Sequence, residues 1–222
     1  MPQIFTASAD TRLRALILGI VAVTGVGMLF IGNAMTSSFA TRVGWVEDQP
    51  VPFSHKHHVG ELGIDCRYCH VNVETDAEAS LPATHVCMTC HSQIFTNAAM
   101  LAPVRESLAQ GKPLLWHRVA RLPDYVYFNH SIHISRGVPC ETCHGRIDEM
   151  ALTTQAQPFQ MEWCLSCHRD PAPHLRPPGE VTRMDWSDWD RRPEQHAGFG
   201  AAAMKSYGID PRKLIDCDVC HR

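Results

Sequence analysis

Residues 66–70 read Cys66-Arg67-Tyr68-Cys69-His70, and this Cys-x-x-Cys-His motif occurs five times in the 222-residue chain. In every copy two residues separate the cysteines, and a histidine follows the second cysteine directly. The four further copies begin at Cys87, Cys140, Cys164 and Cys217, so the motifs contain all ten cysteines of the chain. Because no cysteine is left over, one kind of chemistry must account for all of them.

The motif is the attachment signature of c-type haem, in which two thiols bond to the porphyrin and the adjacent histidine ligates the iron. Structural zinc uses Cys-x-x-Cys units in pairs, so five units would leave one unpaired, and zinc does not require a histidine at a constant offset. A disulfide framework gives no reason for the repeated spacing, and a thioredoxin-like pair normally occurs once. We therefore expect five covalently bound c-type haems. The expected attachment residues are Cys66, Cys69, Cys87, Cys90, Cys140, Cys143, Cys164, Cys167, Cys217 and Cys220, and the expected proximal iron ligands are His70, His91, His144, His168 and His221.

The composition offers little material for a large conventional core, with 8% aromatic residues, 19% charged residues and 15 prolines. Five apolar porphyrins would replace much of the side-chain packing. The expected fold class is therefore a mainly α and irregular multihaem cytochrome c, with a haem-organised core, short helices and long irregular connections that would be unusual in a haem-free domain. The net charge of −3 says little about partners, and no basic tract supports nucleic-acid binding.

The N-terminal part contains an apolar stretch. No charged residue occurs from Ala15 to Thr41, and residues 15–31 are almost continuously apolar, close to the roughly 20 residues that cross a bilayer. Arg12 and Arg14 precede it, so the positive-inside rule predicts a cytoplasmic segment 1–14, a single transmembrane anchor 15–41 and a periplasmic pentahaem domain 42–222, in a bacterial inner membrane. A cleaved signal peptide is the alternative, since residues 32–34 and 38–40 offer small-residue cleavage patterns.

A second repeat lies ahead of two of the motifs. Phe53-Ser-His55-Lys-His57-His58 precedes Cys66 and Phe128-Asn-His130-Ser-Ile-His133 precedes Cys140, so both read Phe-x-His-x-x-His. Each repeat is followed by two haem motifs. This predicts dihaem units at about 51–92 and 126–169, followed by a fifth haem at 217–221.

The connecting segments have weaker signals. Residues 98–109 have helical periodicity that ends near Gly111, and a short helix is expected at 201–207, ended by Gly208, with another helix after Pro211. The proline-rich segment 171–193 is expected to be extended and on the surface.

Fourteen histidines are available, which leaves nine for the five distal iron positions. On a helix, residues i and i+3 share a face, so His55 with His58, and His130 with His133, can each point toward two different irons. His57 and His85 are not expected to be ligands. The fifth distal ligand stays open among His117, His174, His196 and a methionine such as Met184 or Met204. An iron with two protein ligands has no open position for a substrate, which favours electron transfer over catalysis.

The Phe-x-His-x-x-His arrangement resembles that of small multihaem cytochromes of anaerobic respiration, which implies that His55 ligates the Cys66 haem and His130 the Cys140 haem. More broadly, the N-terminal anchor, PFSHKHHVGELGIDCRYCH, CMTCHSQI, LPDYVYFNHSIHISRGVPCETCHG, MEWCLSCHRDP and the final motif resemble the pentahaem cytochrome c subunit of bacterial alternative complex III. In that family a ligand histidine is expected near the segment WHRVARLPDY. In this chain His117 is the only histidine of that segment, and Ala120, further along, cannot be a ligand.

This resemblance implies an electron-transfer subunit, without catalysis of its own, in a respiratory or photosynthetic quinol:electron-acceptor oxidoreductase. The implied partners are an iron–sulfur subunit, polytopic quinol-binding subunits and monohaem cytochrome c subunits, with electrons passing to a periplasmic acceptor or an oxygen reductase. The alternative is a self-sufficient membrane-anchored quinol dehydrogenase of the NapC/NrfH type. That family typically has four haems and a methionine three residues after the first motif histidine, where this chain has Val73.

Overall fold

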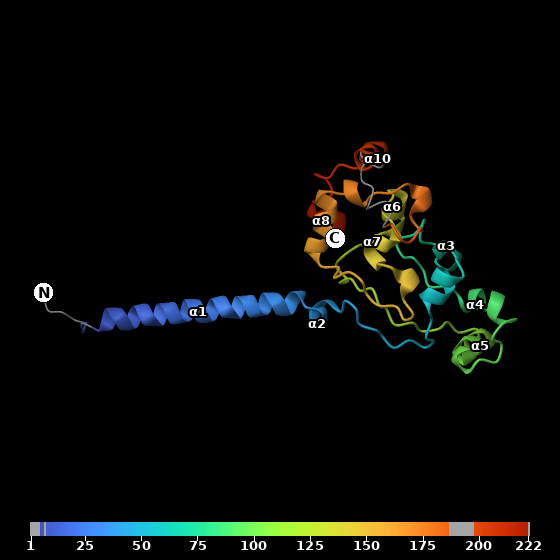
Figure 1. Ribbon diagram of the computed structural model, residues 1–222, viewed down its shortest axis with the longest axis horizontal. Helices are drawn as coiled ribbons and strands as arrows, with labels where there is room; N and C mark the ends of the chain where they lie inside the picture. The colour runs from blue at the N-terminus through green and yellow to red at the C-terminus, as the bar shows by residue number, and fades with distance from the viewer. Residues whose placement is uncertain (1–4, 7, 187–197, 222) are drawn as a thin grey trace. The chain divides into compact units, whose positions relative to one another are not determined.

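The computed structural model describes residues 5–6, 8–186 and 198–221, and the chain divides into two compact units, residues 1–42 and 43–222. The described residues form helices and irregular segments with isolated β-bridges but no strand, which confirms the prediction of a mainly helical chain (Figure 1). The helices of the first unit are α1 (Ala9–Thr36) and α2 (Ser38–Thr41). Those of the second unit are η1 (Lys56–Glu61), α3 (Cys66–Cys69), α4 (Thr84–His91), η2 (Ala99–Leu101), α5 (Ala102–Gln110), α6 (His130–Ser135), α7 (Cys140–His144), η3 (Ile147–Glu149), α8 (Met161–Arg169), η4 (Ala172–His174), η5 (Pro178–Glu180), α10 (Phe199–Tyr207) and α11 (Cys217–Cys220).

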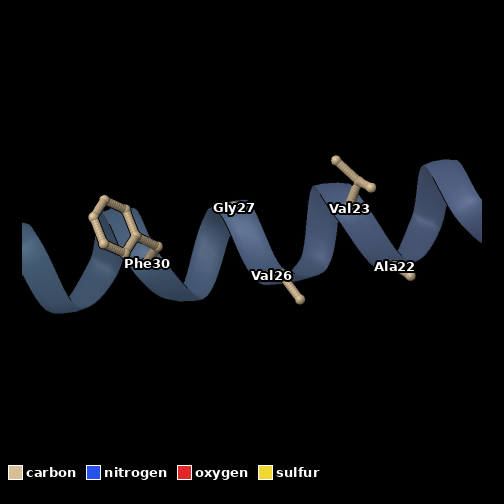
Figure 2. Close-up of a pocket in the computed structure, with 5 residues that line it drawn as sticks. All are labelled: Ala22, Val23, Val26, Gly27 and Phe30. Atoms are coloured by element: carbon tan, nitrogen blue, oxygen red, sulfur yellow. The ribbon is translucent and has the colours of Figure 1, made fainter.

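Helix α1 is a candidate membrane anchor. It has 28 residues, and its most apolar stretch of 18 residues has a mean hydropathy of 2.4. None of its residues is buried. At 1.5 Å per residue it is about 42 Å long, which exceeds the roughly 30 Å of a bilayer core. Figure 2 shows one stretch of it, where the side chains of Val23, Val26 and Phe30 project from the helix. The few polar side chains bond to the helix itself, as Thr24 Oγ1 does to the Ile20 carbonyl at 2.8 Å. Such internal hydrogen bonds suit a helix in an apolar solvent.

The second unit is built from short helices, and each Cys-x-x-Cys motif forms one helical turn or part of a slightly longer helix. Cysteines at i and i+3 on such a turn project from the same face. Helix α3 shows how a turn begins, since Asp65 caps it by accepting a hydrogen bond from the backbone N–H of Arg67 at 2.9 Å. Helix α4 is held against α5 by a 2.6 Å hydrogen bond between the hydroxyls of Thr84 and Ser107.

The side-chain core of this unit is small. Its buried cluster consists of Val73, Ile134 and Val181, with Ala79 packed against it. Such a cluster is thin for a unit of this length, because a side chain of this size contributes only about 1.5–3 kcal/mol on burial.

The prediction of an extended surface segment at 171–193 is wrong for its described part. Leu175 and Val181 are each only 1% exposed, and Trp186 is 5% exposed. The prolines do not hold the chain on the surface. Pro173 and Pro178 lie in the single-turn helices η4 and η5, and Pro171 and Pro177 directly precede these helices. Residues 187–193 lie outside the described residues.

Gly137 provides a test of this packing. Its φ is +78°, and the backbone N–H of Arg176 donates to its carbonyl oxygen at 2.7 Å. A Cβ atom at this position would overlap the carbonyl oxygen of Arg176. The left-handed conformation costs about 1–2 kcal/mol for a residue with a Cβ atom, and the overlap adds to it, so Gly137→Ala should lower the free energy of unfolding by about 3 kcal/mol.

The matched control is Gly111→Ala, because Gly111 also has a positive φ (+63°) but has nothing within 4 Å of its Cβ position. This variant should lose only about 1 kcal/mol. Thermal unfolding of the haem-loaded protein in detergent measures both losses. Equal losses in the two variants would show that residues 137 and 176 do not pack as described.

Candidate haem and iron sites

Among the described residues of the second unit, three pairs of imidazoles face one another. Each pair joins one motif histidine to one histidine of a Phe-x-His-x-x-His repeat. The ring centroids are 6.2 Å apart for His58 and His91, 6.4 Å for His130 and His144, and 6.1 Å for His133 and His168. Two nitrogen–metal bonds of about 2.0–2.1 Å, plus about 1.1 Å from each nitrogen to its ring centre, give about 6.3 Å across one metal ion. The three separations therefore fit one iron per pair.

His55, the first histidine of the first repeat, is half-buried. Its pKa is lowered to about 4, first by burial and then by the charges of His70, His144 and His58, which lie close to it. Burial also lowers the pKa of His144 to about 4, with His130 and His70 adding to the effect. A lowered pKa keeps an imidazole neutral at pH 7, and only the neutral ring has a lone pair with which to bind a metal.

Hydrogen bonds orient the imidazoles for metal binding. An Nδ1 that faces a carbonyl oxygen must carry the proton, which leaves Nε2 free to ligate a metal. The Nδ1-to-oxygen distances are 2.9 Å from His55 to the Thr153 hydroxyl and 2.9 Å from His58 to Ser54, 2.8 Å from His130 to Ala77 and from His133 to Asn129, 2.6 Å from His70 to Ser80, 2.9 Å from His168 to Leu214, and 3.3 Å from His91 to Ile94 and from His221 to Tyr125. Apart from Thr153, every acceptor here is a backbone carbonyl.

The phenylalanine of each repeat has a role that sequence reasoning missed. The ring of Phe53 stacks on His58, with centroids 4.4 Å apart and planes 24° apart, and meets His55 edge-on at 4.9 Å and 86°. Phe128 does the same to His133, at 4.5 Å and 27°, and to His130, at 4.7 Å and 88°. One aromatic ring thus sets the orientation of both imidazoles in each repeat. The signal was present in the sequence, because the phenylalanine recurs with the histidines.

The two repeats differ in backbone. His130 and His133 lie on the α-helix α6, as expected, whereas His55 precedes and His58 lies within the π-helix η1. The side chains of His58 and His133 are nevertheless held alike, because the Nδ1 of each lies at hydrogen-bond distance from the carbonyl four residues earlier. The wide π-helical turn comes after His58, where the N–H of Leu62 donates to the carbonyl of His57, five residues earlier. Short π-helices are rare and are frequent at functional sites.

The remaining described histidines are exposed or half-buried. His57 is half exposed, with its Nδ1 2.9 Å from Glu61 Oε2, and His85 is exposed on α4. His117 is exposed as well, but its Nδ1 lies 2.6 Å from the carbonyl of Asp48. His174, in η4, is half-buried.

The fifth iron position is not resolved by these contacts. Among the described residues no imidazole faces His221 as in the other pairs; its aromatic neighbour is Tyr125, with centroids 5.7 Å apart. Met184 and Met204 are half-buried, and His196 lies outside the described residues. The choice of the fifth distal ligand therefore stays a prediction.

The thiols are not gathered as in a structural zinc site. The described residues contain no group of three or more histidine, cysteine or acidic side chains around one point.

Imidazoles facing each other at a metal-bridging distance, beside paired thiols, form the ligand set of a c-type cytochrome with several haems. No protein-family model matches the chain. Its sequence is 30% identical over 176 residues to the menaquinone reductase multiheme cytochrome c subunit of Nitratidesulfovibrio vulgaris (Hildenborough), in an alignment that covers 79% of this chain and 68% of that protein. The chain therefore belongs to the family of this multihaem cytochrome c subunit.

Proposed function

We propose that the chain carries electrons through five covalently bound c-type haems, as a subunit of a membrane complex that exchanges electrons with the quinone pool. The observation that carries the proposal is the set of three imidazole pairs with centroids 6.1 to 6.4 Å apart, each including a motif histidine. When bound, haem supplies one-electron chemistry at its iron. The proposed proximal ligands are the five motif histidines, and the proposed distal ligands are His55, His58, His130 and His133.

The same pairs argue against catalysis by this chain. A haem that binds or reduces a small substrate needs a vacant or weakly held axial position. With His58 opposite His91, His130 opposite His144 and His133 opposite His168, both axial positions at those sites would be filled by protein. Quinone chemistry would then take place in partner subunits.

His117 is our proposal for the fifth distal ligand. Its Nδ1 faces a carbonyl oxygen, that of Asp48, as do those of His58, His130 and His133. The segment that holds it is fixed on both sides, because Gln49 accepts from the His117 N–H at 2.9 Å and donates to the His117 carbonyl at 2.8 Å.

For the particular complex, our proposal follows the resemblance to alternative complex III. The chain would belong to an inner-membrane complex with an iron–sulfur subunit, polytopic quinol-binding subunits and monohaem cytochrome c subunits. The helix α1 would anchor the chain, and the haem-bearing unit would lie on the periplasmic side. In this arrangement electrons from quinol would leave to a periplasmic acceptor or an oxygen reductase.

Electrons could also flow in the opposite direction, toward the quinone. This direction is supported by the relative in Nitratidesulfovibrio vulgaris, which is a menaquinone reductase subunit. In a complex of that kind electrons would enter from a periplasmic donor and reduce the quinone. The ligand set of this chain serves both directions equally well.

Purification of the tagged chain from native membranes in mild detergent tests the proposal. Intact mass should show five covalent haems, and the co-purified proteins should include iron–sulfur and polytopic membrane subunits. Adding quinol or reduced periplasmic donor to the complex then reveals which of them reduces the haems. Fewer than five haems would contradict the proposed cofactor content, and quinol oxidation by the isolated chain in liposomes would favour the NapC/NrfH-type alternative.

A further inference from the structure

The five haem motifs lie in space in an order that differs from their order in the sequence. Each site is named here by the first cysteine of its motif. The Cys66 and Cys87 sites are neighbours, because their proposed distal ligands, His55 and His58, are held by the same Phe53 ring. Their motif helices also touch, since the hydroxyls of Tyr68 in α3 and Thr89 in α4 lie 3.0 Å apart.

The Cys66 site has a second neighbour, the Cys140 site. A single loop, residues 77–80, serves both sites. Its Ala77 carbonyl accepts from His130 at 2.8 Å, and its Ser80 carbonyl accepts from His70 at 2.6 Å. These two hydrogen bonds therefore join the first motif to the third.

The Cys140 site is in turn next to the Cys164 site. Helix α6 carries the proposed distal ligands of both, with His130 facing His144 and His133 facing His168.

The Cys217 site joins at the other side of the Cys164 site. The Nδ1 of His168 lies 2.9 Å from the carbonyl of Leu214, three residues before Cys217. The last motif is therefore tied to the fourth.

We infer that the five haem sites form one unbranched row in the order Cys87, Cys66, Cys140, Cys164, Cys217. The inference rests on the proposed function. It places the second motif of the sequence at one end of the row and the first motif inside it. Two of the ten cysteines are exposed, Cys90 and Cys217, and they belong to the two ends of the row. Donor and acceptor should therefore meet the chain at the Cys87 and Cys217 sites, the donor losing and the acceptor gaining one electron per transfer, with no proton or group to balance.

Iron–iron distances from an electron cryo-microscopy map of the haem-loaded complex test the order directly. The four shortest distances should join Cys87 to Cys66, Cys66 to Cys140, Cys140 to Cys164, and Cys164 to Cys217. A shortest path in which the Cys87 site adjoins the Cys140 or Cys164 site would overturn the inference. Intact mass counts the haems, so the two proposals can fail separately. Fewer than five haems would contradict the proposed function, whereas five haems in another spatial order would contradict only the proposed row.

Electron paramagnetic resonance gives a second readout that does not depend on activity. Removing a distal histidine should make one iron high-spin, and that iron should perturb the low-spin signals of the neighbouring haems. A site at an end of the row has one neighbour and an inner site has two, so one signal should change in the first case and two in the second. His58→Ala creates the former case at the Cys87 site, and His130→Ala the latter at the Cys140 site. Two perturbed signals in the His58 variant, or only one in the His130 variant, would contradict the order.

Discussion

Replacing both thiols of the Cys140 site, as Cys140→Ser with Cys143→Ser, should prevent the chain from accumulating as a folded protein. The same change at the last site, Cys217→Ser with Cys220→Ser, should leave a stable protein with four haems. The difference follows from burial, because Cys140 and Cys143 are both half-buried and lie between two other motifs, whereas at the last site Cys217 is exposed and only Cys220 is half-buried.

Magnitudes explain why the loss of an inner haem should be decisive. A porphyrin that hides about 400 Å² of apolar surface contributes on the order of 10 kcal/mol at 25 cal/mol per Å². Whole domains are stable by only about 5–15 kcal/mol. The eight buried apolar residues in the described part of this unit already have to offset the conformational entropy of the whole unit, so they cannot replace that contribution. A haem at the exposed end hides less protein surface, so its loss costs less.

Immunoblots of membrane fractions measure how much of each variant accumulates, and intact mass counts its haems. Expression of the haem-attachment machinery must be equal in both strains. If the two double variants accumulate to the same level, the proposed haem-organised core is incorrect, because an inner and an end haem would then contribute alike.

The sequence predicted the local parts of this fold well. The helix expected at 98–109 is present as η2 and α5, and Gly111 ends it with a positive φ of 63°. The helix before Gly208 is also confirmed, as α10. These features depend on periodicity and on the conformational freedom of glycine, both of which are local. The helix expected after Pro211 is wrong, since the chain forms turns there before α11.

Tertiary features could not be predicted in the same way. The spacing of His55 and His58 indicated two ligands, but nothing local shows that His58 faces His91, 33 residues further along. Proline content indicates a surface segment, but Leu175 and Val181 are buried, because the direction of their side chains depends on tertiary packing and not on the local sequence. The π-helix at His58 was missed for a related reason, because its wide turn depends on contacts of η1 with η3, a segment almost ninety residues away in sequence.

His58→Ala should convert one of the five haems from low-spin to high-spin, whereas His57→Ala should leave all of them low-spin. His58 faces His91 at a centroid distance of 6.2 Å and is held by Phe53 and by the Ser54 carbonyl. His57 instead lies at the surface, half exposed, 2.9 Å from Glu61. An exposed pair of this kind contributes at most about 1 kcal/mol, so its loss should not disturb the neighbouring site.

Carbon monoxide binding to the reduced protein measures the difference, because the gas binds only an iron with an open or weakly held position. About one fifth of the haems should bind it in the His58 variant and none in the His57 variant. The same titration applied to His117→Ala and His174→Ala decides between two candidates for the fifth ligand, and our proposal expects binding only in the His117 variant. Carbon monoxide binding after His57→Ala, together with none after His58→Ala, would reverse the assignment of the first repeat and would mean that the 6.2 Å pair does not enclose an iron.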